Sequence, residues 1–157
     1  MNDRTSPRYS CPIARALGVM GDLWSVLIIR DAIYGLKRFD EFQSSLKIAP
    51  NILTQRLKAL VADGILERHP YQTRPLRHEY VITAKGRDLQ PVLWALMAWG
   101  NRYMSPEGHL VDLADPATNA IVEPVMVDAA TGRPLSEGVR VIAGPAASST
   151  IINQYGS

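Results

Sequence analysis

The sequence is poor in cysteine and histidine. Cys11 is the only cysteine among the 157 residues. A disulfide within the chain and a zinc site built from several cysteines are therefore excluded, although two copies could still be joined through Cys11. The three histidines, His69, His78 and His109, do not have the short spacings of a metal site. We therefore expect no metal and no other cofactor.

Long apolar runs are also missing. No stretch approaches the roughly 18 apolar residues that a membrane-spanning helix needs. Residues 1–8 are polar and contain no apolar segment of the signal-peptide kind. No nucleophile elbow, phosphate loop or dinucleotide-binding fingerprint occurs. We therefore expect a cytoplasmic protein without a membrane partner, and not an enzyme.

Charge is divided unequally along the chain. Residues 1–104 carry 15 basic and 9 acidic side chains, a net charge of +6, whereas residues 105–157 carry 2 basic and 6 acidic side chains, a net charge of −4. A basic segment suits a polyanionic partner, and an acidic one would be repelled by it. We expect an N-terminal arm over residues 1–10, a domain over residues 11–104 and a β-rich extension over residues 105–157.

Hydrophobic periodicity predicts a series of helices. Asp22 is placed to cap the second helix and Gly35 to end it, and Pro50 suits the first turn of the fourth. Thr83 is placed to cap the fifth, in which Pro91 is expected to cause a kink. The predicted helices run from Ile13 to Gly18, Leu23 to about Tyr34, Phe39 to Leu46, Pro50 to Asp63, and Thr83 to about Tyr103.

Two strands are predicted between the fourth and fifth helices. They cover residues 65–71 and 78–83, and the polar, proline-containing residues 72–77 indicate a hairpin with an extended tip. The short segment 37–39 suits either a strand or a turn. Two further strands are expected in the extension, over residues 121–127 and 139–143, with a turn at residues 128–132. The fold class is therefore α+β: a winged helix-turn-helix domain with a C-terminal β-hairpin extension.

The helices at residues 39–46 and 50–63 have the spacing of a helix-turn-helix. The N-terminal residues of the second helix of such a motif reach base edges in the major groove. Asparagine and glutamine can pair with adenine, threonine can contact a thymine methyl or a phosphate, and basic side chains approach phosphates. The predicted DNA contacts of this helix are Pro50, Asn51, Thr54, Gln55, Arg56 and Lys58.

The hairpin after this helix matches a wing. Arg74 and Arg77 near its tip are suited to phosphates or to a narrow minor groove. Each of these side chains, taken alone, is equally explained as part of a solvated surface. The combination of groove-sized polar side chains with a basic hairpin favours double-stranded DNA as the partner.

The fifth helix is apolar over more than half of its circumference, which indicates burial on two sides, as in a homodimer. The alternative is that the extra face packs on residues 105–157. The side chains predicted to form the dimer contact are Leu89, Val92, Leu93, Leu96, Trp99 and Tyr103.

Several motifs in order resemble the HxlR family of regulators. The resemblance covers about residues 9–104, and five motifs together are specific where each alone is weak. They are an opening formed by Cys11–Ala14 and Gly21–Arg30, then Arg38–Phe42, Leu53–Leu60, Asp63–Arg68, and the run from Glu79 through Gly86 to Leu93, Trp99 and Gly100. The resemblance implies a winged helix related to the MarR group, dimerisation through the terminal helices, and binding to palindromic DNA near promoters, with repression favoured.

The resemblance also draws attention to Cys11, because some HxlR-type proteins sense oxidants or electrophiles through a cysteine at this position. Cys11 precedes a helix and has Arg8 and Arg15 close in sequence, which favours a thiolate. The alternative is a small buried side chain at the junction of arm and domain. A different function is a ligand- or protein-binding module in which residues 105–157 form a small-molecule pocket with Trp94, Trp99 and Tyr103.

Overall fold

The structure, a computed structural model, describes residues 11–147 and 149–155. The predicted arm, residues 1–10, lies outside the described residues. The chain divides into two compact units, residues 1–90 and residues 91–157. The fifth predicted helix, which we had assigned to the DNA-binding domain, thus lies mostly in the second unit. The functional boundary after residue 104 stays a prediction.

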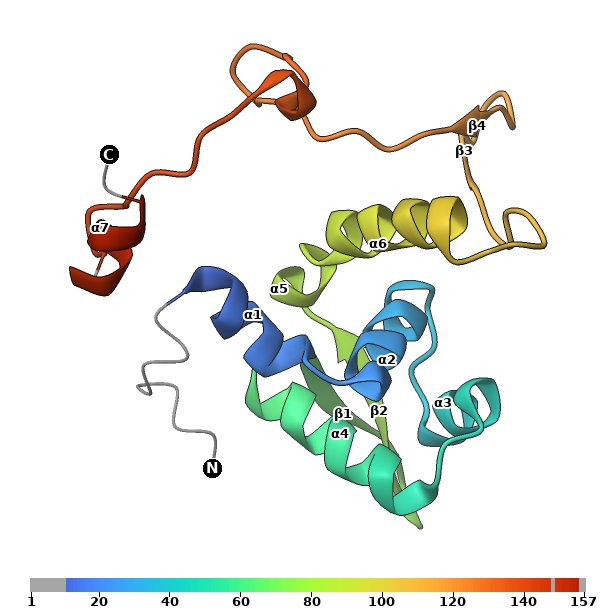
Figure 1. The fold of residues 1–157 in the computed structure, drawn as a ribbon. Coiled ribbons are helices and arrows are strands. Elements are labelled where there is room, and N and C mark those ends of the chain that lie inside the picture. The colour runs from blue at the N-terminus through green and yellow to red at the C-terminus, as the bar shows by residue number, and fades with distance from the viewer. Residues whose placement is uncertain (1–10, 148, 156–157) are drawn as a thin grey trace. The chain divides into compact units, whose positions relative to one another are not determined.

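The first unit has the predicted order of elements (Figure 1). The helix predicted to end at Gly18 continues through it to Met20. Within the described ranges no single helix is both long and apolar enough to cross a bilayer; α1 and α2 pass that test only together, across a bend of 79°. The elements are α1 (Pro12–Met20), α2 (Leu23–Ile33), α3 (Phe39–Leu46), α4 (Pro50–Ala62), β1 (Leu66–Thr73), β2 (Leu76–Ile82) and α5 (Ala84–Arg87).

The predicted helix boundaries follow from local capping. Asp22 accepts a hydrogen bond from the backbone amide of Ser25 at 3.0 Å, which satisfies a free N–H at the start of α2. Gly35 follows α2 at φ 104°, a conformation that a side chain would strain. At α3, hydrogen bonds from the backbone amides of Lys37 and Arg38 hold the pKa of the Glu41 carboxyl below its ordinary value.

The core of the first unit lies where α2, α3 and α4 meet the hairpin. One buried charge belongs to it: Asp31 accepts hydrogen bonds from the Arg30 guanidinium at 2.7 and 2.9 Å and from the Ser45 hydroxyl at 2.7 Å, so the carboxylate is compensated. The fully buried apolar side chains are Ile28, Ile29, Phe42, Leu53, Leu57, Leu60 and Leu66.

Strands β1 and β2 form the predicted antiparallel hairpin. Its register shifts between Pro70 and Gln72, so Tyr71 is bulged out of the ladder. Arg38 forms an isolated bridge with Glu79, and the Tyr80 amide donates to the Lys37 carbonyl at 2.7 Å. Residues 37–39, predicted as either a strand or a turn, therefore contain a one-residue β-bridge at Arg38 and no longer strand, and Phe39 already begins α3.

The second unit departs from the prediction at its first element. The long helix expected from Thr83 to Tyr103 is wrong: Thr83 caps the short α5, a turn follows at Asp88 and Leu89, and α6 begins at Gln90. The reason is Pro91, which has no N–H and whose ring would collide with the carbonyl four residues earlier. A proline is tolerated in a first turn, and α6 (Gln90–Tyr103) starts accordingly.

The extension contains less strand than predicted. The extension contains a short β-hairpin, but its strand β4 (Ile121–Val122) pairs with β3 (Leu113–Ala114), which was not predicted, and not with residues 139–143. The strand expected to reach residue 127 stops at Val122, before Pro124, which cannot donate. Residues 139–143 form no strand. The predicted turn is present, since the Gly132 amide donates to the Asp128 carbonyl at 2.7 Å. The 3-10 helix η2 (Leu135–Glu137) and the unpredicted α7 (Ser149–Tyr155) complete the chain.

Candidate nucleic-acid interface

Helix α4 has two chemically distinct faces. Leu53, Leu57 and Leu60 are buried in the core. The short connection from α3 turns at Lys47, whose φ of 51° is left-handed, and this turn sets the direction in which α4 leaves. Five of the six predicted α4 contacts are therefore exposed together: Pro50, Asn51, Thr54, Gln55 and Lys58.

The exposed side chains have free groups of the kind that bases require. The amides of Asn51 and Gln55 make no hydrogen bond within the described part of the chain, so their donors and acceptors are available. The Thr54 hydroxyl donates to the Pro50 carbonyl at 2.8 Å, which leaves its methyl group for an apolar contact. Because these residues lie in the first two turns of α4, they occupy the end of a recognition helix that approaches base edges.

Arg56 lies differently from the other predicted contacts. Its side chain is 32% exposed, and its Nε is 3.3 Å from Oδ1 of Asp22, the residue that caps α2. The pair is close, but the geometry does not make a hydrogen bond, because the buried Nε has no hydrogen-bond partner. Arg56 therefore connects α4 to the start of α2, and its contact with DNA stays a prediction.

The wing presents its predicted arginines to the solvent. Arg74 and Pro75 form the tip, and Arg77 lies opposite Gln72 on β2. All three of Arg74, Pro75 and Arg77 are exposed. The wing therefore presents two cations next to the motif that have no ion-pair partner among the described residues, as a phosphate-binding hairpin requires.

The structure adds residues that the sequence did not indicate. The Arg38 guanidinium lies 4.8 Å from the centre of the Tyr71 ring. Tyr71 and Arg77, with Phe39, also line a cavity of about 510 Å³ between the start of α3 and the hairpin. The contact depends on the bulge at Tyr71 and on the bridge at Arg38, neither of which follows from hydrophobic periodicity.

Five of the six predicted dimer residues lie on α6, which has no buried residue, and Leu89 lies in the turn just before it. Leu89 and Leu93 are half-buried. The rings of Trp99 and Tyr103 pack against each other with centroids 5.6 Å apart. The exposed fractions of the other four side chains are 42% for Val92, 53% for Leu96, 56% for Trp99 and 63% for Tyr103.

Cys11, the predicted redox residue, is a free thiol at the N-cap of α1 and is half-buried. The Arg15 amide donates to the Cys11 carbonyl at 3.1 Å and closes the first turn of the helix. Cys11 therefore occupies the N-cap position of α1, where its side chain makes no capping hydrogen bond.

Helices α3 and α4 pack on the core through their buried side chains, α4 exposes a polar row, and a basic hairpin follows. Together these features define a winged helix-turn-helix DNA-binding protein. The chain belongs to the HxlR-like helix-turn-helix family, which matches residues 19–108. It is a transcriptional regulator with a helix-turn-helix DNA-binding fold.

Proteins with related sequences and structures are described as transcriptional regulators or transcription factors. The HTH-type transcriptional regulator Rv3095 of Mycobacterium tuberculosis is 37% identical over 116 residues, which is 73% of each chain. The solved structure of PA1374 from Pseudomonas aeruginosa, described as a transcription factor, is 52% identical with a TM-score of 0.67, covering 92% of this chain and 99% of that one. The redox regulator HypR in its reduced form is 35% identical with a TM-score of 0.56, covering 62% and 99%.

Proposed function

We propose that the protein is a homodimeric repressor that binds a palindromic operator in double-stranded DNA. The observation that carries this proposal is the exposed polar row on α4, which is held by a buried leucine face and followed by a basic wing. A dimer would place two α4 helices in successive major grooves about 34 Å apart, with the wings on flanking backbone. A dimer bound at a promoter represses by blocking the polymerase.

The direct test is selection from a pool of random duplexes. The wild-type protein should enrich a palindrome whose half-site centres are about ten base pairs apart. Gln55→Ala should bind with a changed preference at one base pair of each half-site, because a bidentate contact to adenine contributes about 1–3 kcal/mol of discrimination. The enriched sequences of the two proteins are compared by sequencing the bound fraction.

Gln43→Ala is the matched control, because it removes a glutamine from α3 rather than from the exposed row of α4. It should enrich the same palindrome as the wild type. Enrichment of no motif would contradict the proposal. An unaltered motif with Gln55→Ala would reject this residue as a reader of bases.

Arg77→Ala should weaken binding to every duplex about tenfold, because a phosphate contact carries no sequence information. The slope of log affinity against log salt should become shallower by about 1, since one fewer counterion is released. Fluorescence anisotropy over a series of salt concentrations measures both. Arg133→Ala in the extension should leave affinity and slope as they are, and an unchanged slope for Arg77→Ala would show that the wing does not contact phosphate.

A second candidate function is redox sensing through Cys11. Two observations support redox sensing: Cys11 has a half-buried free thiol at the N-terminus of a helix, and the chain is similar to the redox regulator HypR. Diamide would oxidise two Cys11 thiols from two subunits to a disulfide and take up their two protons and two electrons. DNA affinity should then change at least about fivefold, corresponding to 1 kcal/mol, whereas Cys11→Ser should not respond. Unaltered affinity after alkylation of Cys11 would exclude this function.

A further inference from the structure

The second unit contains a cavity that DNA binding does not explain. It lies between the C-terminal half of α6 and the β3–β4 pair, and its volume is about 610 Å³. Ligand pockets in proteins have volumes of about 300–1,000 Å³. Much of its wall is apolar, with Met97 from α6, Leu113 from β3, and Ile121 and Val122 from β4.

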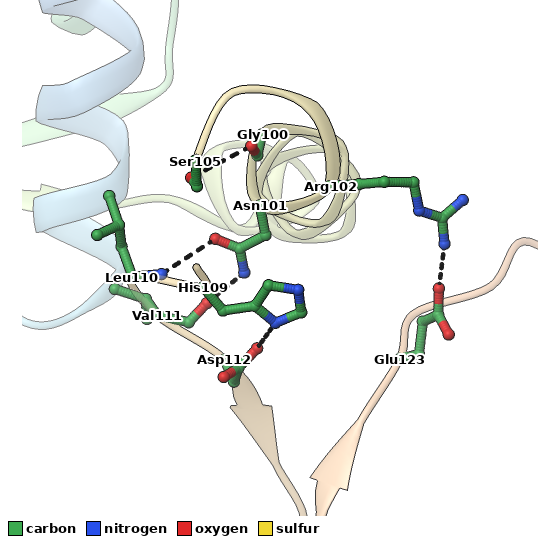
Figure 2. A network of polar contacts seen from close by, with 9 residues as sticks. All are labelled: Gly100, Asn101, Arg102, Ser105, His109, Leu110, Val111, Asp112 and Glu123. Atoms are coloured by element: carbon green, nitrogen blue, oxygen red, sulfur yellow. Dashed lines mark hydrogen bonds and ion pairs between the residues drawn. The ribbon is translucent and has the colours of Figure 1, made fainter. Parts of the chain in front are cut away.

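The wall is held by hydrogen bonds between α6 and the loop that follows it (Figure 2). Asn101 Nδ2 donates to the Val111 carbonyl at 2.7 Å, and its Oδ1 accepts from the Leu110 amide at 3.4 Å. The Ser105 hydroxyl donates to the Gly100 carbonyl at 3.3 Å. The side chains of Asn101 and Ser105 are therefore already hydrogen-bonded to the backbone, and these bonds fix the shape of the cavity wall.

The charged groups in the wall already have polar partners. Arg102 of α6 forms an ion pair with Glu123, and His109 Nδ1 lies 2.8 Å from Oδ1 of Asp112. Figure 2 shows these two pairs on opposite sides of the space below α6. A charged ligand would have to displace one partner, so the wall favours an uncharged one.

The His109 imidazole keeps one ring nitrogen without a hydrogen-bond partner within the described residues. When the His109 ring is neutral, its Nδ1–H donates to Asp112, which places the acceptor lone pair on Nε2. Within the described residues Nε2 makes no hydrogen bond. It can accept one from a ligand hydroxyl, and unlike the carboxylate oxygens of Asp112 and Glu123 it is an uncharged acceptor.

We propose that this cavity binds an uncharged, largely apolar small molecule that carries a hydroxyl group, such as a phenol with one or two fused rings. The apolar body lies against Met97, Leu113 and Ile121, and the hydroxyl donates to His109 Nε2. This effector site goes beyond the proposed DNA-binding function and does not depend on it.

The two faces of α6 keep this site separate from the predicted dimer contact. At 3.6 residues per turn, Met97, Ala98 and Asn101 lie on the face opposite to Leu96 and Trp99. Trp99 and Tyr103 lie on the other side of the helix, and Trp94, although on the same face as Ala98 and Asn101, does not line the cavity. The aromatic pocket expected from the sequence around these three residues is therefore not this cavity. A second copy packed on Leu96 and Trp99 would leave the cavity open.

The experiment uses the full chain and three probes of one size: 2-naphthol, naphthalene and 2-naphthoate. Isothermal titration should show binding of 2-naphthol. Naphthalene should bind about threefold to tenfold more weakly, because it lacks the hydroxyl that makes one neutral hydrogen bond. The charged 2-naphthoate should be weaker still. His109→Ala should lower the affinity for 2-naphthol to that for naphthalene and leave naphthalene unaffected, whereas His69→Ala, outside the cavity, should alter neither.

A second pair of variants tests the location. Ala98→Leu should fill the cavity and abolish binding of 2-naphthol, whereas Ala95→Leu, on an exposed part of the same helix, should not. The proposal is overturned if none of the probes binds, if 2-naphthoate binds most tightly, or if His109→Ala keeps the preference for the hydroxyl. Loss of probe binding as the protein concentration rises would also overturn it, because a second copy would then occupy the groove. None of these results bears on operator binding, which the duplex selection tests separately.

Discussion

Leu96→Arg should convert the protein to a monomer and lower its affinity for a palindromic duplex about a thousandfold. Leu96 is 53% exposed and lies with Trp99 and Tyr103 on the apolar face of α6. An arginine there would have to be desolvated without a partner when two copies meet, so the dimer is lost. The isolated subunit is little affected, because Leu96 is not part of its core.

The size of the effect follows from linking two weak contacts. In the proposed dimer each α4 helix and wing would bind one half-site, and the second contact would form at the high effective concentration set by the first. A monomer loses that gain and binds a half-site only. Its affinity for a single half-site should therefore equal that of a wild-type subunit, and only the palindrome should distinguish the two proteins.

Sedimentation measures the oligomeric state, and anisotropy on palindromic and single half-site duplexes measures the binding. Leu110→Arg is the matched control, because Leu110 is an equally apolar leucine, 68% exposed, that lies in the extension outside α6. It should remain dimeric. If Leu96→Arg remained dimeric with full affinity, the predicted interface on α6 would be wrong.

Phe42→Ala should lower the free energy of unfolding of the first unit by about 3–5 kcal/mol. Phe42 is fully buried on α3, in a core formed with residues such as Ile28 and Leu57. Removing its ring leaves a cavity in a domain whose total stability is only about 5–15 kcal/mol. The variant should also lose DNA affinity, because this ring holds α3 to the core on which α4 packs.

Urea unfolding followed by circular dichroism, at one protein concentration, measures the change. Phe39→Ala is the natural comparison: Phe39 lies three residues earlier on α3 but is only half-buried. Phe39→Ala should lower the free energy of unfolding by clearly less than Phe42→Ala. A loss of under 1 kcal/mol for Phe42→Ala would mean that the core can close around the missing ring.

Elements with strong local signals were predicted almost to the residue. The boundaries of α3 were correct, and α4 ended one residue earlier than expected. Asp22, Gly35 and Thr83 act through backbone groups within a few residues, so their effect can be seen in the sequence. Pro91 has a larger effect than the predicted kink, because α5 and α6 are two separate helices and not one bent helix.

Elements that need a distant partner were predicted less well. The apolar residues 139–143 have the composition of a strand, but a strand exists only if another edge supplies its hydrogen bonds. Likewise, nothing local indicates that Arg38 stacks on Tyr71 or that Arg56 turns towards Asp22. These contacts join residues that are more than 30 positions apart in the chain.

The sequence by itself therefore determined the order of helices, the presence of the wing and the exposed polar row on α4, because periodicity and capping are local properties. The sequence contains one cysteine and three histidines, so thiol and imidazole chemistry is limited to these four side chains. Only the tertiary structure decided what those few groups face. It placed the local pair of His109 and Asp112 at the cavity of the second unit, because the segment after α6 folds back along that helix, where Asn101 binds the Val111 carbonyl.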